Sequence, residues 1–197
     1  MSRFVTILAL ASVLAGCAFT DDTVAISYKP SDATHIADAS PVILTIVDGR
    51  TIDRNRIGTK VNGYGMEMGA IRSATPVPEI VRAALTTEFE RRGFQLDSSG
   101  RGLTIKIDSL FSHAVIGFLT VDIVGDVDLN VTVAAVSGST LFSRVYTGAA
   151  KETVAIGTPS AHAEMVAAAL KDAVEKMFGD RNFLQSLAPA TGPKPGT

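Results

Sequence analysis

The sequence predicts a single-domain α+β protein in which a mostly antiparallel sheet carries two helices packed on one face. The chain has 197 residues, of which 46% are hydrophobic and 19% charged, so it can bury one core. Apolar residues recur at helical spacing in two segments and alternate with polar residues in three others. Together with an apolar run that precedes them, these segments follow the order β-α-β-β-β-α, which suits one sheet covered by helices.

The first strand is predicted at 42–47, an apolar run followed by the turn residues Asp48 and Gly49. A run without polar alternation favours a central strand that is covered on both faces. The first helix is predicted to begin near Pro78, because proline suits the first helical turn, and to end at Gly93. Its apolar residues fall on one face, which would pack on the sheet.

Three later segments alternate between apolar and polar residues, near 103–115, 119–136 and 141–154. This period of two is typical of strands with one buried and one solvated face. Short glycine-containing connections between them predict an antiparallel meander. Gly125 lies inside the longest strand and predicts a bulge.

The clearest helical pattern begins after Thr158 and Pro159 and ends at Gly179. Its apolar residues form a stripe of about four turns, as expected for a helix that covers a sheet. A short helical turn is predicted at 182–187. The sequence therefore supplies the second covering helix near its C-terminus.

The N-terminus has the layout of a secretory signal over residues 1–16, with Arg3 ahead of the apolar run 4–15. About a dozen apolar residues are too few to span roughly 30 Å of hydrocarbon as a stable helix. The end of this segment matches the lipobox of bacterial lipoproteins, formed here by Leu14, Ala15, Gly16 and Cys17. An ordinary signal peptide that happens to precede a cysteine is the alternative.

The lipobox resemblance implies a mature chain that begins at Cys17, with diacylglycerol on its sulfur and an N-acyl chain on its amino group. Several acyl chains anchor a protein stably in a membrane. Cys17 is the only cysteine, which excludes an intramolecular disulfide, and no cofactor other than these lipids is expected. Ala18 follows the cysteine, and by resemblance to known sorting rules this favours the inner leaflet of the outer membrane, facing the periplasm.

The mature chain is predicted to have three parts. Residues 17–40 are the lipidated N-terminus and a polar tether, residues 41–187 are the α+β periplasmic domain, and residues 188–197 are a disordered tail rich in proline and glycine. A flexible tether of this length has a root-mean-square span of about 25 Å and reaches about 75 Å when extended. The domain could then stand clear of the lipid surface.

Several chemistries find no support in the sequence. A formal charge of −2 lacks the basic excess that attracts nucleic acid. His35, His113 and His162 do not have the spacing of a helical metal site, and no nucleophile motif of the GxSxG type occurs. The sequence therefore predicts that the protein is not an enzyme.

The segment 48–77 is the candidate partner-binding loop, since thirty residues without evident regular structure are long for a compact domain. It holds five basic and three acidic residues, an excess that could meet an anionic lipid, a glycan or an envelope protein. The alternative is a solvated loop in which Arg50 pairs with Asp48 or Asp53. The candidate binding residues are Arg50, Arg54, Arg56, Lys60 and Tyr64.

Beyond the lipobox, the chain resembles the YajG family of bacterial outer-membrane-type lipoproteins. The resemblance rests on the segments Val47-Asp48-Gly49-Arg50, Ile57-Gly58, 77–85, Arg91-Arg92-Gly93-Phe94, Leu103-Thr104-Ile105, Val127-Asp128-Leu129 and Phe142-Ser143-Arg144-Val145-Tyr146. The family is uncharacterised, so the resemblance implies location and architecture and supplies no catalytic residue. We expect a membrane-anchored, non-enzymatic binding or scaffold module of the cell envelope. The alternative is an auxiliary lipoprotein subunit of a lipid or polysaccharide transport system. The sequence sets no oligomeric state.

Overall fold

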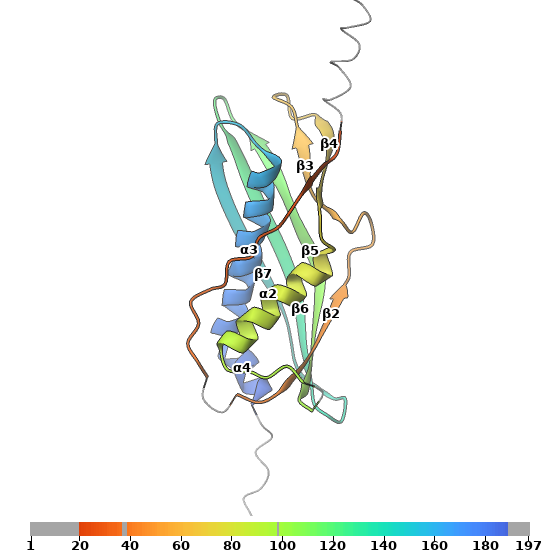
Figure 1. Ribbon diagram of the computed structural model, residues 1–197, viewed down its shortest axis with the longest axis vertical. Helices are drawn as coiled ribbons and strands as arrows, with labels where there is room; N and C mark the ends of the chain where they lie inside the picture. Colours follow the sequence, from red (N-terminus) through yellow and green to blue (C-terminus); the bar gives the residue numbers. More distant parts are fainter. Residues whose placement is uncertain (1–19, 37–38, 98, 189–197) are drawn as a thin grey trace, which may run out of the picture.

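The computed structural model describes residues 20–36, 39–97 and 99–188. Over these residues one mixed sheet of seven strands carries all helices on one face, which confirms the predicted α+β single domain (Figure 1). The elements are β1 (Asp22–Val24), β2 (Val42–Asp48), β3 (Arg56–Val61), β4 (Glu67–Ser73), α2 (Val77–Arg91), β5 (Arg101–Ile116), β6 (Val121–Ala134), β7 (Thr140–Val154), α3 (Pro159–Gly179) and α4 (Arg181–Leu187).

The three long strands β5, β6 and β7 form the predicted antiparallel meander. The predicted bulge at Gly125 is wrong, because Gly125 pairs in regular register with Ser112, and the shift in register lies between Ile107 and Ser109. Gly125 serves a packing purpose instead. A Cβ atom at this position would lie 2.4 Å from the carbonyl oxygen of Met165, so the glycine lets the backbone of α3 touch the sheet.

A second glycine brings α3 against the neighbouring strand. A Cβ atom on Gly148 in β7 would lie 2.0 Å from the carbonyl oxygen of Ala169. The helix itself starts at a capped turn, where the Thr158 hydroxyl accepts a hydrogen bond of 3.2 Å from the backbone N–H of Ala161. Between helix and sheet the space is filled by buried apolar side chains, including Val127, Leu129, Val166, Leu170, Val174 and Met177.

Helix α2 ends as its sequence predicts, at Gly93, which has a φ of 89°. The N–H of Phe94 donates to the carbonyl oxygen of Phe89 over 3.0 Å, and the N–H of Gly93 donates to that of Glu90 over 3.0 Å. This pair of bonds is the Schellman arrangement, which requires a left-handed residue after the helix. The rings of Phe89 and Phe94 are 5.2 Å apart and complete the end of the helix with an apolar contact.

The prediction that β2 is a central strand covered on both faces is wrong. β2 pairs with β5 alone, in parallel, and its residues alternate between the helix-covered face and solvent. Ile43 and Val47 are exposed on the open face. β3 takes the same side of β5 further along, where Gly58 pairs with Ser112. The apolar run therefore marks an edge strand whose outer side chains stay in contact with water.

The expectation of a structureless segment at 48–77 is also corrected. Most of it is an antiparallel hairpin of β3 and β4, in which Lys60 pairs with Gly69. The side chain of Asn62 holds the connecting turn, accepting from the backbone N–H groups of Tyr64 over 2.9 Å and Met66 over 3.1 Å. Irregular chain remains between β2 and β3, where Asp53 adopts a φ of 44°.

Much of the predicted tether belongs to the fold. β1 pairs in parallel with β4, Asp22 lying opposite Ile71, and Ser31 further along is buried. The predicted signal, lipobox and Cys17, together with residues 189–197 of the predicted tail, lie outside the described residues. Within the described ranges, no helix combines the length and apolar character needed to cross a membrane.

Candidate functional site

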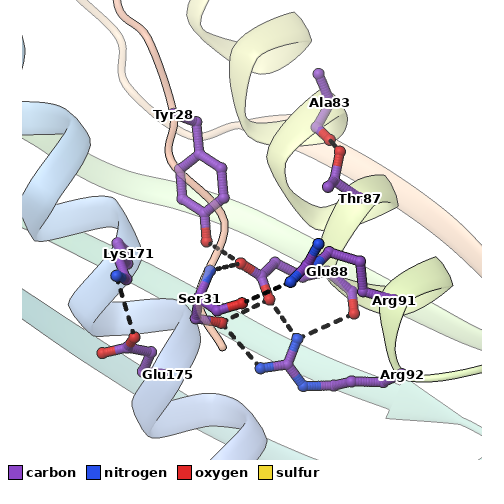
Figure 2. Close-up of polar contacts among 9 residues, drawn as sticks. All are labelled: Tyr28, Ser31, Ala83, Thr87, Glu88, Arg91, Arg92, Lys171 and Glu175. Carbon is purple, nitrogen blue, oxygen red and sulfur yellow. Dashed lines mark hydrogen bonds and ion pairs between the residues drawn. The ribbon is translucent and has the colours of Figure 1, made fainter. Parts of the chain in front are cut away.

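A buried carboxylate fixes the N-terminal segment 20–36 to helix α2. Glu88 is wholly inaccessible to solvent, and its carboxylate accepts hydrogen bonds of 2.7 Å each from the Tyr28 hydroxyl, the Ser31 backbone N–H and the Ser31 hydroxyl. Figure 2 shows the donors converging on Glu88 from the N-terminal segment and from α2. We call this group, Tyr28, Ser31, Glu88 and Arg92, the Glu88 clamp.

Arg92 supplies the counter-charge of the clamp. Its guanidinium forms an ion pair with Glu88, donates to the Glu88 carbonyl oxygen over 3.0 Å and to the Ser31 hydroxyl over 3.0 Å, and lies 4.0 Å from the centroid of the Phe178 ring. Burial alone would raise the pKa of Glu88, but the hydrogen bonds from Ser31, Tyr28 and Arg92 outweigh it and lower that pKa. Glu88 is therefore held as a carboxylate.

Two further ion pairs hold the start of the described chain. Lys60 donates to the Asp22 carboxylate over 2.7 Å and to the Thr20 carbonyl oxygen over 2.7 Å. Arg72 pairs with Asp21 over 2.8 Å, and the backbone N–H of Ala70 donates to the same carboxylate over 2.9 Å. These contacts continue the β1–β4 pairing and tie the segment to the β3–β4 hairpin.

The cations predicted to form a partner-binding loop are engaged within the protein. Arg50 makes a two-pronged pair with Asp48, at 2.9 and 2.8 Å, as the solvated-loop alternative expects. Arg56 pairs with Glu67 over 2.9 Å, while the Nε of Arg54 donates to the Arg50 carbonyl oxygen over 2.9 Å. Asp21 and Asp22 thus supply the two acidic partners that the segment 48–77 lacks by itself, so its local excess of positive charge is neutralised. Tyr64 lies apart from these arginines, in the β3–β4 turn.

One end of the molecule carries a cavity surrounded by exposed apolar side chains. The cavity has a volume of about 370 Å³ and is lined by the β3–β4 turn, the β5–β6 turn and the β7–α3 connection. Of the lining residues, Phe118 is 98% exposed, Leu119 79% and Ile156 76%, and Tyr64 (90%) and Met66 are exposed in the β3–β4 turn that borders the cavity. We call these five residues the apolar end. Exposed apolar residues gathered in this way are typical of interaction surfaces.

The lining of this cavity includes the buried His162, which contacts the buried Ser112. The Ser112 hydroxyl donates to the Ile57 carbonyl oxygen over 3.0 Å and lies 2.8 Å from Nδ1 of His162, which assigns the ring proton to Nδ1. Burial, with a smaller contribution from the charge of His113, lowers the pKa of His162 to about 4, so the ring is neutral near pH 7. Ser112 is fully buried, and its proton is committed to a carbonyl group.

Sequence reasoning missed both the clamp and the apolar end, although each left a signal. Glu88 lies seven residues after Val81, on the apolar face of its helix, where a carboxylate must find buried partners. Phe118 and Leu119 lie in a tight turn, where polar residues are usual. Among the described residues, no group of three metal-ligating side chains occurs.

Comparison with solved structures finds this fold in another bacterial protein. A protein from Xanthomonas campestris assigned to the family DUF330 aligns with a TM-score of 0.62 and 16% identity, covering 83% of this chain and 96% of its own. A minor lipoprotein from Acinetobacter baumannii gives a TM-score of 0.47 and 9% identity, with coverage of 75% and 94%. Comparison with curated proteins finds no match.

The fold is thus a single-domain α+β fold that the Xanthomonas campestris protein shares. The model of a family described as uncharacterized lipoprotein matches residues 28–188, a range that includes the clamp and starts after Cys17. The chain belongs to this family of bacterial lipoproteins. Membership indicates a membrane-anchored location in the cell envelope.

Proposed function

We propose that the protein is a YajG-type outer-membrane lipoprotein, anchored through acyl chains on Cys17, that acts as a non-enzymatic binding or scaffold module in the periplasm. The observation that carries the proposal is the lipobox Leu14-Ala15-Gly16-Cys17, which ends in the sole cysteine, ahead of a domain matched by a lipoprotein family model. The acyl chains supply the membrane attachment. The folded domain supplies the surfaces for an envelope protein or a glycan.

The chemistry of the described residues supports a role without catalysis. Ser112 and His162 form a hydroxyl-imidazole pair, and the serine proton bonds to a backbone carbonyl group. A nucleophile must reach its substrate and pass its proton to the base, and this hydroxyl does neither. The pair is better explained as a polar contact that joins β5 to the start of α3.

The alternative, an auxiliary subunit of a lipid or polysaccharide transport system, requires an apolar groove between the helices and the sheet. That space is closed where α3 touches Gly125 and Gly148. The cavity at the apolar end is open to a ligand, but it involves only the first turn of α3, at one end of the helix-sheet interface, and does not extend along it. We therefore favour the scaffold role over the transport role.

Lipidation is tested by Cys17→Ser expressed as the full chain in a bacterial host. The variant should lose labelling by radioactive palmitate and accumulate as a precursor that keeps residues 1–16. Thr20→Ser, a neighbouring change that leaves the lipobox intact, should be labelled and processed normally. Unchanged labelling of Cys17→Ser would refute the anchor. Ala18→Asp should move the protein from the outer to the inner membrane fraction if the sorting interpretation holds.

The binding role is tested at the loop between β2 and β3. Arg54 is exposed and forms no ion pair among the described residues, so Arg54→Glu should leave the melting temperature unchanged. Arg56 is a poorer choice because its pair with Glu67 would be lost as well. Arg54→Glu should reduce crosslinks to envelope partners in intact cells. An unchanged crosslink pattern would remove this loop from the proposed binding surface.

A further inference from the structure

The five residues of the apolar end lie in three chain connections, none of which contains a charged residue. These are 62–66 between β3 and β4, 117–120 between β5 and β6, and 155–158 between β7 and α3. All three border the same cavity, and in Figure 1 they lie together at the upper end of the sheet. Aromatic and aliphatic side chains that project from such turns are what a protein needs to enter the interface of a bilayer.

The described chain begins at this same end. Thr20 lies against β4, where a Cβ atom on Gly69 would meet the Thr20 carbonyl oxygen at 2.5 Å, and Lys60 binds that oxygen. Thr20 is the third residue after Cys17 along the chain. Even fully extended, three residues span at most about 11 Å. An acylated Cys17 would therefore bring the apolar end to the membrane surface.

We propose that the apolar end is a membrane-docking surface, with Phe118, Leu119, Ile156 and Tyr64 inserted among the lipid headgroups and upper acyl chains. The proposal rests on the lipidation of Cys17 proposed above. It adds that the domain is held against the bilayer in one orientation, with the β6–β7 turn pointing into the periplasm. The occupant of this surface is the bilayer that holds the anchor.

The charges next to the apolar end favour a lipid surface. Asp122 at the start of β6 pairs with Lys151 over 2.7 Å, and Asp22 pairs with Lys60. Paired carboxylates add little repulsion towards anionic headgroups. The opposite end has fewer exposed apolar side chains, with Val136 in the β6–β7 turn and Leu141 at the start of β7. Position and composition together select the membrane over a protein partner.

The absence of tryptophan from the sequence allows a direct test. Phe118→Trp, purified as the processed lipoprotein that begins at Cys17, carries one indole in the β5–β6 turn. Val136→Trp is the matched control, because Val136 is also exposed in a hairpin turn but lies at the other end. Both proteins are reconstituted into vesicles of phosphatidylethanolamine and phosphatidylglycerol with brominated acyl chains, and association is checked by flotation.

In Phe118→Trp the emission should shift to the blue, and bromine quenching should roughly halve its intensity, because the indole lies at the depth of the acyl chains. Val136→Trp should keep a water-like, unquenched emission. Ile156→Trp should behave like Phe118→Trp as an independent probe of the same end. If the proteins float with the vesicles but Phe118→Trp and Ile156→Trp are not quenched, the docking surface is refuted and the anchor stands. If neither protein floats, the anchor and the docking surface are both refuted.

Discussion

His162 should make the fold sensitive to mild acid. The pKa of the buried ring is about 4, against an ordinary value of 6.5. Between these values the unfolded chain binds a proton and the folded chain does not, so stability falls as the pH falls from 6.5 towards 4. The full shift corresponds to about 3 kcal/mol, of which about 2 kcal/mol is lost by pH 5. At pH 5 the paired carboxylates, whose pKa values are lowered, remain charged.

The measurement is urea unfolding at pH 7 and pH 5 for the natural protein and for His162→Asn, whose amide can replace Nδ1–H as the donor to Ser112. The natural protein should lose about 2 kcal/mol more than the variant between the two pH values. His113→Asn is the control, because it keeps the His162 ring buried and removes only the smaller contribution of His113 to the pKa of His162. An equal loss in the natural protein and His162→Asn would show that the ring is not held neutral by burial.

Two further changes test the clamp and the packing of α3. Glu88→Gln removes the charge that compensates Arg92 and should lower the free energy of unfolding by about 3 to 5 kcal/mol, with chymotrypsin then cutting after residue 28, whereas Tyr28→Phe removes one donor and should cost about 1 kcal/mol; equal effects of the two would contradict the clamp. Gly148→Val should fail to yield a folded protein, because even a Cβ atom at this position would lie 2.0 Å from the backbone of α3. Gly179→Ala is the control, because the space around Gly179 is open, and its free energy of unfolding, measured by thermal unfolding, should stay within about 0.5 kcal/mol of that of the natural protein.

The sequence predicted the elements whose periodicity extends over many residues. The meander 101–154 and the helix that starts at Pro159 repeat one buried face often enough to identify both type and position. β1 has three residues and no pattern, and it exists because β4 offers it an open edge. β3 and β4 are short and each contains a glycine, so their pairing depends on contacts with distant segments that the local sequence does not encode.

The candidate loop shows why a local charge count is a poor guide to a binding surface. Counted along 48–77, the arginines and Lys60 exceed their acidic neighbours by two. Asp22 and Asp21 remove that excess, and they lie 38 and 51 residues before their partners Lys60 and Arg72. The charge counted within one segment therefore predicts the net charge of a surface only when no distant segment folds against it. Because residues 17–40 were predicted to be a free tether, Asp21 and Asp22 were not expected to pair with that surface.

The clamp affects the apolar end because it helps to set the length of free chain between Cys17 and the folded domain. With β1 paired to β4 and the clamp closed, the anchor is joined to the domain by about 11 Å of chain, and with the whole segment released, residues 18–40 would reach about 75 Å. Glu88→Gln combined with Lys60→Ala, which removes the bonds to Asp22 and Thr20, should therefore weaken bromolipid quenching in the Phe118→Trp background under conditions in which chymotrypsin, in a parallel digest, cuts after Tyr28. If quenching stayed at full strength although the parallel digest showed this cut, apolar contact with the lipid, and not the short connection, would hold the domain at the membrane.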